Sequence, residues 1–301
     1  MKLSKRSKMN ALKTILVSLF LTFFLIINFA NAFDYSVPKT DKEFTEKIAK
    51  LKWKKGPGYI SHDKAKASIY FNDEYYVLKG EDARQILYWN NGVEIPTDIY
   101  AENTKRGYYY DFKFRDSGLI KIDDWAKVNA NDFIKERRTI AKENNPARAS
   151  KGLETVASMQ WNEKPTLDKR NNQVYYSILV KWSDGQSSID SKIITLGRRG
   201  YTEISLVSSP QSYSPILLKD MSKKYKYNKD EKYTDWKSGD KVAAVGIGAL
   251  LATSLGLKAV KPGVLAVILG LLKKFWFVIL IPFLALGSFV KRLFKGKSKG
   301  K

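Results

Sequence analysis

The hydrophobic positions of this chain fall into three regions with different patterns. Residues 14–29 and 242–290 are almost continuously apolar, whereas residues 33–240 mix apolar and charged positions at short spacing. In the middle region, apolar side chains recur at every second residue, the period of a half-buried strand, or every three to four residues, the period of a helix. The pattern therefore predicts a folded middle region between two membrane-directed ends.

Period-two alternation is clearest in the segments that predict strands. At residues 108–114, aromatic side chains alternate with polar ones, and a similar alternation covers residues 175–182. Asp184-Gly185 then gives a strong hairpin signal, with return strands expected at 189–196 and 202–206. Strands joined by turns this tight pair antiparallel, so the second half of the chain predicts a meander.

Helix signals lie mainly between these strand segments. Thr40 and Glu43 have the spacing of a capping box, which predicts a helix that begins there. Further helices are expected at 80–89, 132–143 and 215–222, and two short strands joined by a turn at 67–71 and 75–78. Residues 119–122 are expected to form a return strand after 108–114. The fold class that follows is α+β, an antiparallel meander sheet with helices packed on one face, plus C-terminal membrane helices. A seam within the domain is expected near residues 146–152, where polar residues and proline cluster.

The N-terminal end has the organisation of a secretory signal. A basic segment precedes the apolar run, and Ala30-Asn31-Ala32 supplies the small residues of a signal-peptidase site. Residues 1–32 are therefore interpreted as a signal peptide cleaved after Ala32, with an exported domain at residues 33–240. An uncleaved signal anchor is the alternative, because the apolar run is long for a signal peptide.

Residues 241–301 are interpreted as a membrane anchor with a basic tail. The uninterrupted apolar run at 275–290 is flanked by lysines and arginine that can reach the two interfaces, and it predicts one crossing with the tail in the cytoplasm. Residues 242–257 form a shorter apolar run that is rich in small residues. Residues 242–272 are expected to pack in the outer leaflet or as a re-entrant pair, and a second full crossing by residues 242–257 is the alternative. Small residues recur every four positions there and predict a helix-packing face, either within the chain or against a second copy: Ala244, Gly248, Ala252 and Gly256.

The charge distribution argues against a nucleic-acid partner. The formal net charge is +23, but fifteen positive charges lie in the leader, the tail and the lysines that flank the hydrophobic stretches, which leaves an excess of eight in residues 33–241. Most of the excess positive charge therefore lies where lysine and arginine direct export and membrane topology. The chain has no cysteine, which excludes disulfides, thiolate metal sites and a cysteine nucleophile.

Two basic segments are candidates for contact with lipid head groups. Arg198 and Arg199 lie between glycines in an expected turn, and arginine makes bidentate contacts with oxyanions. Residues 223–236 interleave lysines with aromatic residues, and such side chains favour the membrane interface. The candidate contact residues are Arg198, Arg199, Lys223, Lys224, Tyr225 and Trp236. An ordinary basic turn and an amphipathic edge strand are the alternatives.

Candidate catalytic chemistry is sparse. His62 is the single histidine, and its place before an expected strand suggests a solvated turn. Carboxylate pairs occur at Asp73-Glu74, Asp123-Asp124 and Asp230-Glu231, all in expected turns or loops, where a solvated role is the simpler interpretation. We therefore assign no catalytic residue, no metal site and no cofactor.

Several modest motifs resemble a bacterial family of predicted membrane-anchored proteins with a domain of unknown function. They are Trp161 followed by Pro165 and a hairpin, Leu196-Gly197-Arg198-Arg199-Gly200, Gly239-Asp240-Lys241-Val242-Ala243-Ala244 and Lys274-Phe275-Trp276, with a looser match around Gly56 and residues 108–122. The resemblance implies an export signal, an envelope domain and a C-terminal anchor. It implies no activity, so no catalytic residue is transferred.

These observations lead to one main functional hypothesis. The chain is expected to be a bacterial envelope protein at the cytoplasmic membrane, with its main domain on the periplasmic side and a non-catalytic binding or scaffolding role. Its expected partners are membrane lipids and an envelope protein, with self-association through the C-terminal helices as a further interpretation. The alternative is a membrane-bound hydrolase that uses His62 or paired carboxylates.

Overall fold

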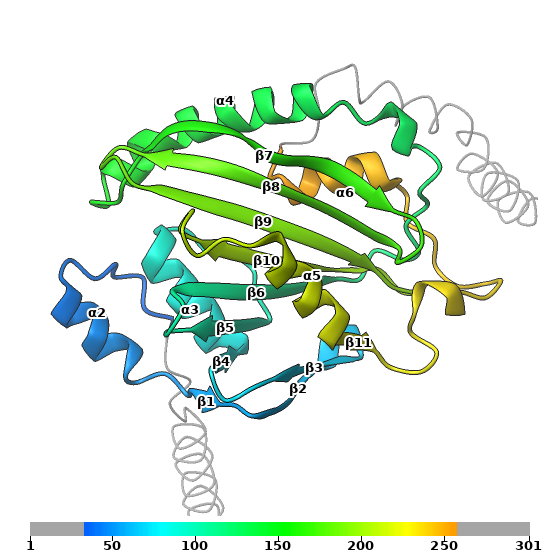
Figure 1. Cartoon of the computed structure of the whole chain (residues 1–301), viewed down its shortest axis with the longest axis horizontal. Coiled ribbons are helices and arrows are strands. Elements are labelled where there is room, and N and C mark those ends of the chain that lie inside the picture. Colours follow the sequence, from blue (N-terminus) through cyan, green and yellow to red (C-terminus); the bar gives the residue numbers. More distant parts are fainter. Residues whose placement is uncertain (1–32, 258–301) are drawn as a thin grey trace, which may run out of the picture.

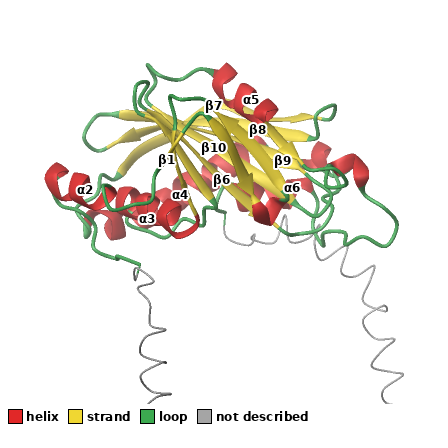
Figure 2. Ribbon diagram, turned by 90° about the horizontal axis from the view of Figure 1, so that it is seen from below, coloured by secondary structure: helices red, strands yellow, loops and turns green. Residues whose placement is uncertain are grey.

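The computed structural model describes residues 33–257 of the chain. An eight-stranded sheet forms the centre of this part. Figures 1 and 2 show on one of its faces the helices α2 (Asp41–Ile48), α3 (Gly80–Asn91), α4 (Ala130–Ala149) and α6 (Ile247–Ser254). We call this face the helical face. A three-stranded sheet and helix α5 (Pro215–Lys224) lie on the opposite face. The strand pairs of both sheets are antiparallel, so the predicted α+β class with an antiparallel sheet is confirmed.

Both halves of the chain contribute to the large sheet, whose strand order is β1-β4-β5-β6-β10-β9-β8-β7. The second half supplies the expected meander: β7 (Val156–Asp168), β8 (Gln173–Trp182), β9 (Ser187–Leu196) and β10 (Tyr201–Ser208). The first half supplies β1 (Lys54–Lys55), β4 (Tyr76–Lys79), β5 (Ile99–Asn103) and β6 (Tyr108–Arg115). The two halves meet where β6 pairs with β10, from Tyr201 opposite Arg115 to Ser208 opposite Tyr108. Residues 146–152, where a seam was expected, therefore lie between two parts of one continuous sheet.

The small sheet contains β2 (Gly58–His62), β3 (Ala67–Phe71) and β11 (Tyr225–Tyr227). Residues 67–71 and 75–78 do include strands, but the prediction that a turn joins them as neighbours is wrong, because β3 and β4 belong to different sheets. Ile69 and Phe71 of β3 face the large sheet and are fully buried, and the Phe71 ring lies 6.0 Å from that of Phe112. Burial of these apolar side chains favours stacking the two sheets over extending one.

The expected return strand at 119–122 is also absent from the structure. Leu119 makes one parallel bridge to Val242, while β6 is already paired on both sides, with β5 and β10. Because both edges of β6 are occupied, the chain after residue 115 has no free edge there to pair with.

Strand alternation distributes the core over both faces of the large sheet. Val174, Tyr176, Ile178 and Val180 of β8 belong to the core beneath α4 (Ala130–Ala149) and α6 (Ile247–Ser254). On the same face, α3 (Gly80–Asn91) packs on β4 and β5, with residues of the α2 (Asp41–Ile48) segment against it.

The expectation that the helices share one face is wrong for α5. Leu218 and Met221 of α5 pack in the core of the opposite face, and the Tyr110 hydroxyl donates to the carbonyl of Leu217 at 3.1 Å. The apolar side of α5 has to be covered, and the aromatic side chains of β6 on that face provide the surface.

Helix boundaries follow local chemistry with one exception. The Thr40 side chain accepts a hydrogen bond from the amide of Glu43 at 3.2 Å, which confirms the expected helix start. In contrast, α4 continues six residues beyond the expected end at 143 and contains Pro146. Its last turns are held to the start of β7, because the Asn145 side chain bonds both the amide and the carbonyl of Val156 at 2.9 Å.

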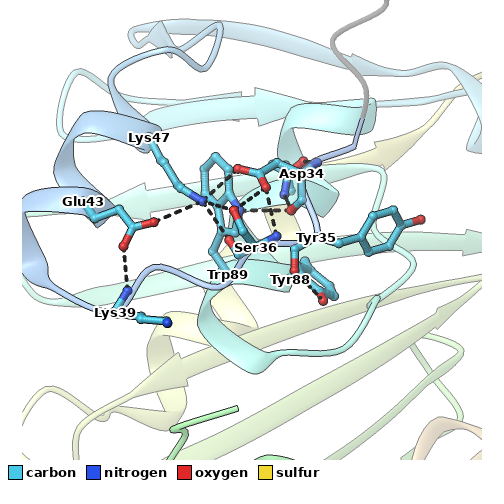
Figure 3. A network of polar contacts seen from close by, with 9 residues as sticks. Asp34, Tyr35, Ser36, Lys39, Glu43, Lys47, Tyr88 and Trp89 are labelled. Carbon is cyan, nitrogen blue, oxygen red and sulfur yellow. Dashed lines mark hydrogen bonds and ion pairs between the residues drawn. The ribbon is translucent and has the colours of Figure 1, made fainter.

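The first described residues are fastened to α3 by the polar network in Figure 3. Lys47 donates to the Asp34 carboxylate and to the Ser36 carbonyl, both at 2.8 Å. Gln85 of α3 exchanges two hydrogen bonds of 2.7 Å with the backbone of Asp34. Although partial burial opposes it, the bonds from Lys47 and Ser36 lower the pKa of Asp34 to about 2, so the carboxylate is ionised at neutral pH. These contacts hold the first described residues against α3.

The structure places residues 242–257 in the folded domain, with α6, Leu255 and Leu257 in its core, and so corrects their assignment to the membrane anchor. Leu250, Leu251 and Leu255 are at most 4% exposed, and α6 packs on the sheet beside β8. Two polar contacts fix its end: the Tyr176 and Ser254 hydroxyls lie 2.9 Å apart, and Lys192 donates to the Ser254 carbonyl at 3.1 Å. The apolar character of this segment thus reflects burial within the domain.

The four small residues of this segment do not form one helix face. Ala244 precedes α6, and Gly256 follows it with a φ of +69°. Ala252 is buried in the domain core, and a Cβ at Gly248 would lie 3.3 Å from a carboxylate oxygen of Asp124, which caps α6. Gly248 and Ala252 therefore pack within the chain, whereas Ala244 and Gly256 are exposed.

Within residues 33–257, no helix combines the length and the apolar character that a bilayer crossing requires. Cleavage after Ala32, the crossing at 275–290 and the basic tail all lie outside the described residues. These three features stay predictions.

Substitution Leu251→Ala tests whether α6 belongs to the folded domain. We expect it to lower the free energy of unfolding by about 2–5 kcal/mol, the usual cost of such a cavity in a core. Urea unfolding of the full-length protein in mild detergent, followed by tryptophan fluorescence, measures this. Val93→Ala, at a position 51% exposed, is the control and should change little. Equal stability of both variants would contradict the placement of α6.

Candidate functional site

A pocket of about 960 Å³ opens at the end of the large sheet where the arrow of β7 ends in Figure 1. Its walls come from the β7–β8 turn with the adjoining ends of β8 and β9, the last turns of α5 with β11, the segment 232–234, and Trp125. We call it the basic pocket. Its size suits a ligand of small-molecule dimensions or the head of a larger one.

Positive charge dominates the lining of this pocket. One carboxylate, Asp168, lines it, and that side chain accepts two hydrogen bonds from Asn171. Six cationic side chains, all exposed at their ends, face it: Lys169, Arg170, Lys219, Lys223, Lys226 and Lys232. Among these six, only Lys223 has a carboxylate within 4 Å in the described part of the chain, Asp220 at 3.6 Å. Such uncompensated charge in a concavity concentrates anions and favours their binding.

Aromatic side chains form the inner wall. Tyr225 of β11 is 4% exposed, and Tyr227 is half-buried beside it, with the two rings 5.5 Å apart and nearly perpendicular. Tyr175 of β8 lies under the ammonium of Lys219, 4.9 Å from the ring centre. This cation–π contact holds one lysine at the pocket mouth without neutralising its charge.

The sequence candidates for head-group contact divide into two sets. Lys223 and Tyr225 line the basic pocket, whereas Lys224 and Trp236 are exposed outside its lining. Arg198 and Arg199 also lie outside it and hold the C-terminal arm of the domain, residues 228–240, to the β9–β10 turn.

Both arginines make strong contacts with carboxylates of that arm. Arg198 makes a bidentate pair with Asp240 at 2.6 and 2.8 Å, and this pair lowers the pKa of the Asp240 carboxyl to about 2. Arg199 pairs with Glu231 at 2.6 Å and lies over the ring of Phe114. The observed contacts of these arginines are therefore structural.

The interpretation of His62 as a solvated turn residue is wrong. His62 ends strand β2 and is 2% exposed, because β2 packs against β6 and β11 through the core of the opposite face. Its Nε2 lies 3.1 Å from the Asp98 carboxylate, and its Nδ1 lies 2.9 Å from the Tyr225 hydroxyl. His62 therefore reaches the inner wall of the basic pocket from behind.

The Asp98 carboxylate, which faces His62, has two further hydrogen-bond donors. It accepts hydrogen bonds from Lys64 at 2.6 Å and from the amide of Phe114 at 2.8 Å. Burial by itself would raise the pKa of Asp98, but the bonds from His62, Lys64 and Phe114 hold it well below its usual range. Asp98 is thus an anion at neutral pH.

The three carboxylate pairs serve separate local contacts. Glu74 accepts from Asn103 at 3.1 Å, Asp124 caps α6 through the amide of Ile247 at 3.0 Å, and Glu231 pairs with Arg199 and Lys66. None of these residues lines the basic pocket. No group of three or more His, Asp or Glu side chains gathers among residues 33–257 in a way that could hold a metal ion.

Sequence reasoning missed part of the pocket. Lys169 and Arg170 come from an ordinary polar turn, and Lys219 comes from a short amphipathic helix. The local sequence around each of them predicts only a solvent-exposed charge. The signal that could have found them is the β7–β8 hairpin, which brings its turn to the same end of the sheet as the turn between β9 and β10. The position of β11 relative to that end depends on the small sheet, which was not predicted.

Comparisons with known proteins identify the family but no function. A family model described as "Protein of unknown function (DUF2167)" matches residues 54–284, more than half of the chain, so the chain belongs to this family. No curated protein matches. Among solved structures, the chain is similar to cyanobacterial PsbP (CyanoP) from Synechocystis sp. PCC 6803, at 13% identity, over 57% of this chain and 92% of that one, with a TM-score of 0.35.

Asp98→Asn tests the buried carboxylate behind the pocket. We expect a loss of about 3 kcal/mol in the free energy of unfolding at pH 7, because the variant removes the charged acceptor that faces His62, Lys64 and the amide of Phe114. The pKa of Asp98 is lower in the folded protein than its ordinary value of 3.8. Its ionised carboxylate therefore contributes fully to the folding stability above that ordinary value, and the contribution is lost as the pH falls through the folded-state pKa. The stability gap between wild type and variant should therefore narrow below about pH 4.

Urea titrations of the full-length protein at a series of pH values measure this gap. Asp73→Asn, in an exposed turn, removes the same charge elsewhere and serves as the control. A gap of the same size at every pH would contradict the ionised state assigned to Asp98.

Proposed function

We propose that this member of the DUF2167 family is an exported, membrane-tethered binding protein of the bacterial envelope, and that its basic pocket holds an anionic ligand that carries phosphate. The observation that carries the proposal is the six-to-one excess of cationic over anionic side chains lining one pocket. Lysine binds phosphate as a point charge, and several converging lysines tolerate different ligand orientations.

Two sources of phosphate suit the pocket. One is the head group of an anionic lipid in the membrane, and the other is a dissolved phosphorylated solute in the envelope. Both present the same chemistry to the lysines, so the test has one arm for each. Aromatic residues at the inner wall support contact with the less polar part of such a ligand.

The tether rests on the sequence and is compatible with the domain. Phe33 packs on Tyr88 of α3 with ring centres 5.4 Å apart, and Leu257 belongs to the core beneath α6. Both ends of the described chain therefore lie on the helical face (Figure 2), which supports attachment of that side to one bilayer. The localisation is proposed as the cytoplasmic membrane, with this domain on the periplasmic side.

A hydrolase is the weaker candidate. A general base must lie within reach of the substrate proton, whereas the His62 side chain is 2% exposed and is enclosed by Asp98 and Tyr225. The carboxylate pairs lie outside the pocket. We therefore prefer binding over catalysis. Self-association through residues beyond 257 stays a separate prediction.

Reversal of two pocket charges tests the proposal. Full-length protein in detergent is titrated with inorganic pyrophosphate, and protein in phosphatidylcholine nanodiscs is tested with vesicles containing phosphatidylglycerol. We expect the double variant Lys223→Glu, Lys226→Glu to bind the ligand at least about tenfold more weakly, at roughly 1 kcal/mol for each charge near an anionic surface. The arm that responds identifies the source of the phosphate.

The matched control is the double variant Lys135→Glu, Lys142→Glu on the exposed side of α4, which changes the net charge by the same amount. Affinity should remain within about twofold of wild type. If both double variants lose affinity equally, binding follows net charge and the pocket has no special role. If wild type binds neither probe, the proposed function is wrong.

A further inference from the structure

A chain of buried hydroxyl groups connects His62 to the wall of the basic pocket. Thr202 of β10 is fully buried, and its hydroxyl lies 2.9 Å from that of Tyr225 and 3.0 Å from that of Tyr227. Tyr227 in turn bonds the carbonyl of Thr195 at 3.0 Å. The series Thr195, Tyr227, Thr202, Tyr225, His62 and Asp98 is thus continuous, with a carbonyl at one end and a carboxylate at the other.

The direction of each hydrogen bond follows from the carbonyl end. A carbonyl only accepts, so Tyr227 must donate to Thr195. The single proton of Tyr227 is then used, and the Thr202 hydroxyl must donate to Tyr227. By the same count Tyr225 must donate to Thr202. With no proton left on Tyr225 for His62, the Nδ1 of His62 must be the donor in the remaining contact.

This count requires both tyrosines to keep their protons. Burial raises the pKa of Tyr225 and of Tyr227 well above the usual phenol value. Each is therefore a neutral phenol with one proton to donate. A phenolate at either position would break the sequence of donors.

The carboxylate end imposes the same requirement on the other ring nitrogen. Asp98 already accepts from Lys64 and from the amide of Phe114, so it acts as an ionised acceptor. The Nε2 of His62, 3.1 Å away, must then donate as well. Each ring nitrogen faces an acceptor, and a neutral imidazole has a proton for only one of them.

We propose that His62 is held as an imidazolium in the folded protein and that its positive charge, directly behind Tyr225 at the inner wall of the basic pocket, favours anion binding there, so that binding depends on the protonation of His62. The protonation state follows from the hydrogen-bond geometry with Tyr225 and Tyr227 as neutral phenols, while its effect on binding rests on the proposed function of the pocket. Loss of the proton leaves Asp98 or Tyr225 facing a bare nitrogen, and it removes a positive charge from behind the anion.

Charged groups from several elements surround His62. Lys64 and Asp63 of the 3₁₀ turn after β2, and Asp98 before β5, lie on one side. Arg199 lies over Phe114, whose ring contacts His62, and Arg199 is paired with Glu231. Asp98 is the carboxylate that bonds the ring directly, so it is the counter-ion of the imidazolium.

Nitrogen NMR tests the protonation state directly. The chain contains one histidine, so full-length protein labelled with ¹⁵N-histidine in detergent gives one pair of ring-nitrogen signals. At pH 7, we expect both nitrogens to carry a proton, with a one-bond coupling to hydrogen on each. A signal from an unprotonated nitrogen at pH 7 overturns the assignment.

Thr202→Val tests the link between the hydroxyl chain and His62. Without the Thr202 hydroxyl, Tyr225 is free to donate to Nδ1, so the neutral tautomer should appear at pH 7 in this variant. Thr139→Val, which removes an exposed hydroxyl on α4, is the control and should leave the imidazolium signals of wild type. If both ring nitrogens of His62 keep their protons in the Thr202→Val variant, the assignment of hydrogen-bond donors along the hydroxyl chain is wrong. If that variant does not fold, the wild-type spectrum alone decides the assignment.

The coupling to binding is measured with pyrophosphate and the same proteins at pH 7. We expect Thr202→Val to bind at least about threefold more weakly than wild type and than Thr139→Val. Equal affinity, with His62 neutral in the variant, overturns the coupling. If wild type shows an imidazolium but binds no pyrophosphate, the choice of ligand fails while the assignment of His62 stands.

Discussion

The pairing of β6 with β10 is the interaction on which the rest of the domain depends. It joins two strands that residues 116–200 separate along the chain, and eight residue pairs connect them. Because β6 brings β5, β4 and β1 with it, and β10 brings the meander, this one pairing produces a single sheet. It also fixes where the chain after β10 can go: α5 crosses the opposite face, and β11 then adds to the small sheet. The side chains of the basic pocket meet as a consequence.

The same arrangement explains how the fold tolerates so many like charges in one place. Apolar burial on both faces of the sheet supplies the driving force for folding, and it includes large side chains such as Tyr110, Phe112 and Ile204. The lysines of the pocket keep their ammonium groups in solvent, so their mutual repulsion is screened and its energetic cost is small. Arg198 and Arg199, which lie outside the pocket, are paired with carboxylates, whereas five of the six cations that line the pocket have no carboxylate within 4 Å among the described residues.

Much of the fold could be predicted from local pattern. The meander, the α+β class and the start of α2 follow from alternation, turn residues and a cap, all of which act within a few residues. The side of the sheet that α5 covers, the separation of β3 from β4 and the burial of His62 depend on contacts between distant segments. Hydropathy also cannot distinguish a helix buried in a domain from one in a membrane, and residues 242–257 show this directly, since Leu250 and Leu251 lie in the domain core. Within the basic pocket, Lys223 and Tyr225 could be predicted from the alternation of lysines and aromatic residues in the sequence. Lys169 and Arg170 could not, because their place in the pocket depends on how the strands of the large sheet are arranged.

The central claim is that an anionic ligand occupies the basic pocket, and hydrogen exchange measured by mass spectrometry tests it most directly. The full-length protein is compared in the presence and absence of pyrophosphate and of vesicles containing phosphatidylglycerol. Our account predicts slower exchange of backbone amides at residues 168–173 and 219–234 with at least one of them, and unchanged exchange in α2 and α4. Protection confined to other regions, or no protection with either ligand, would contradict it.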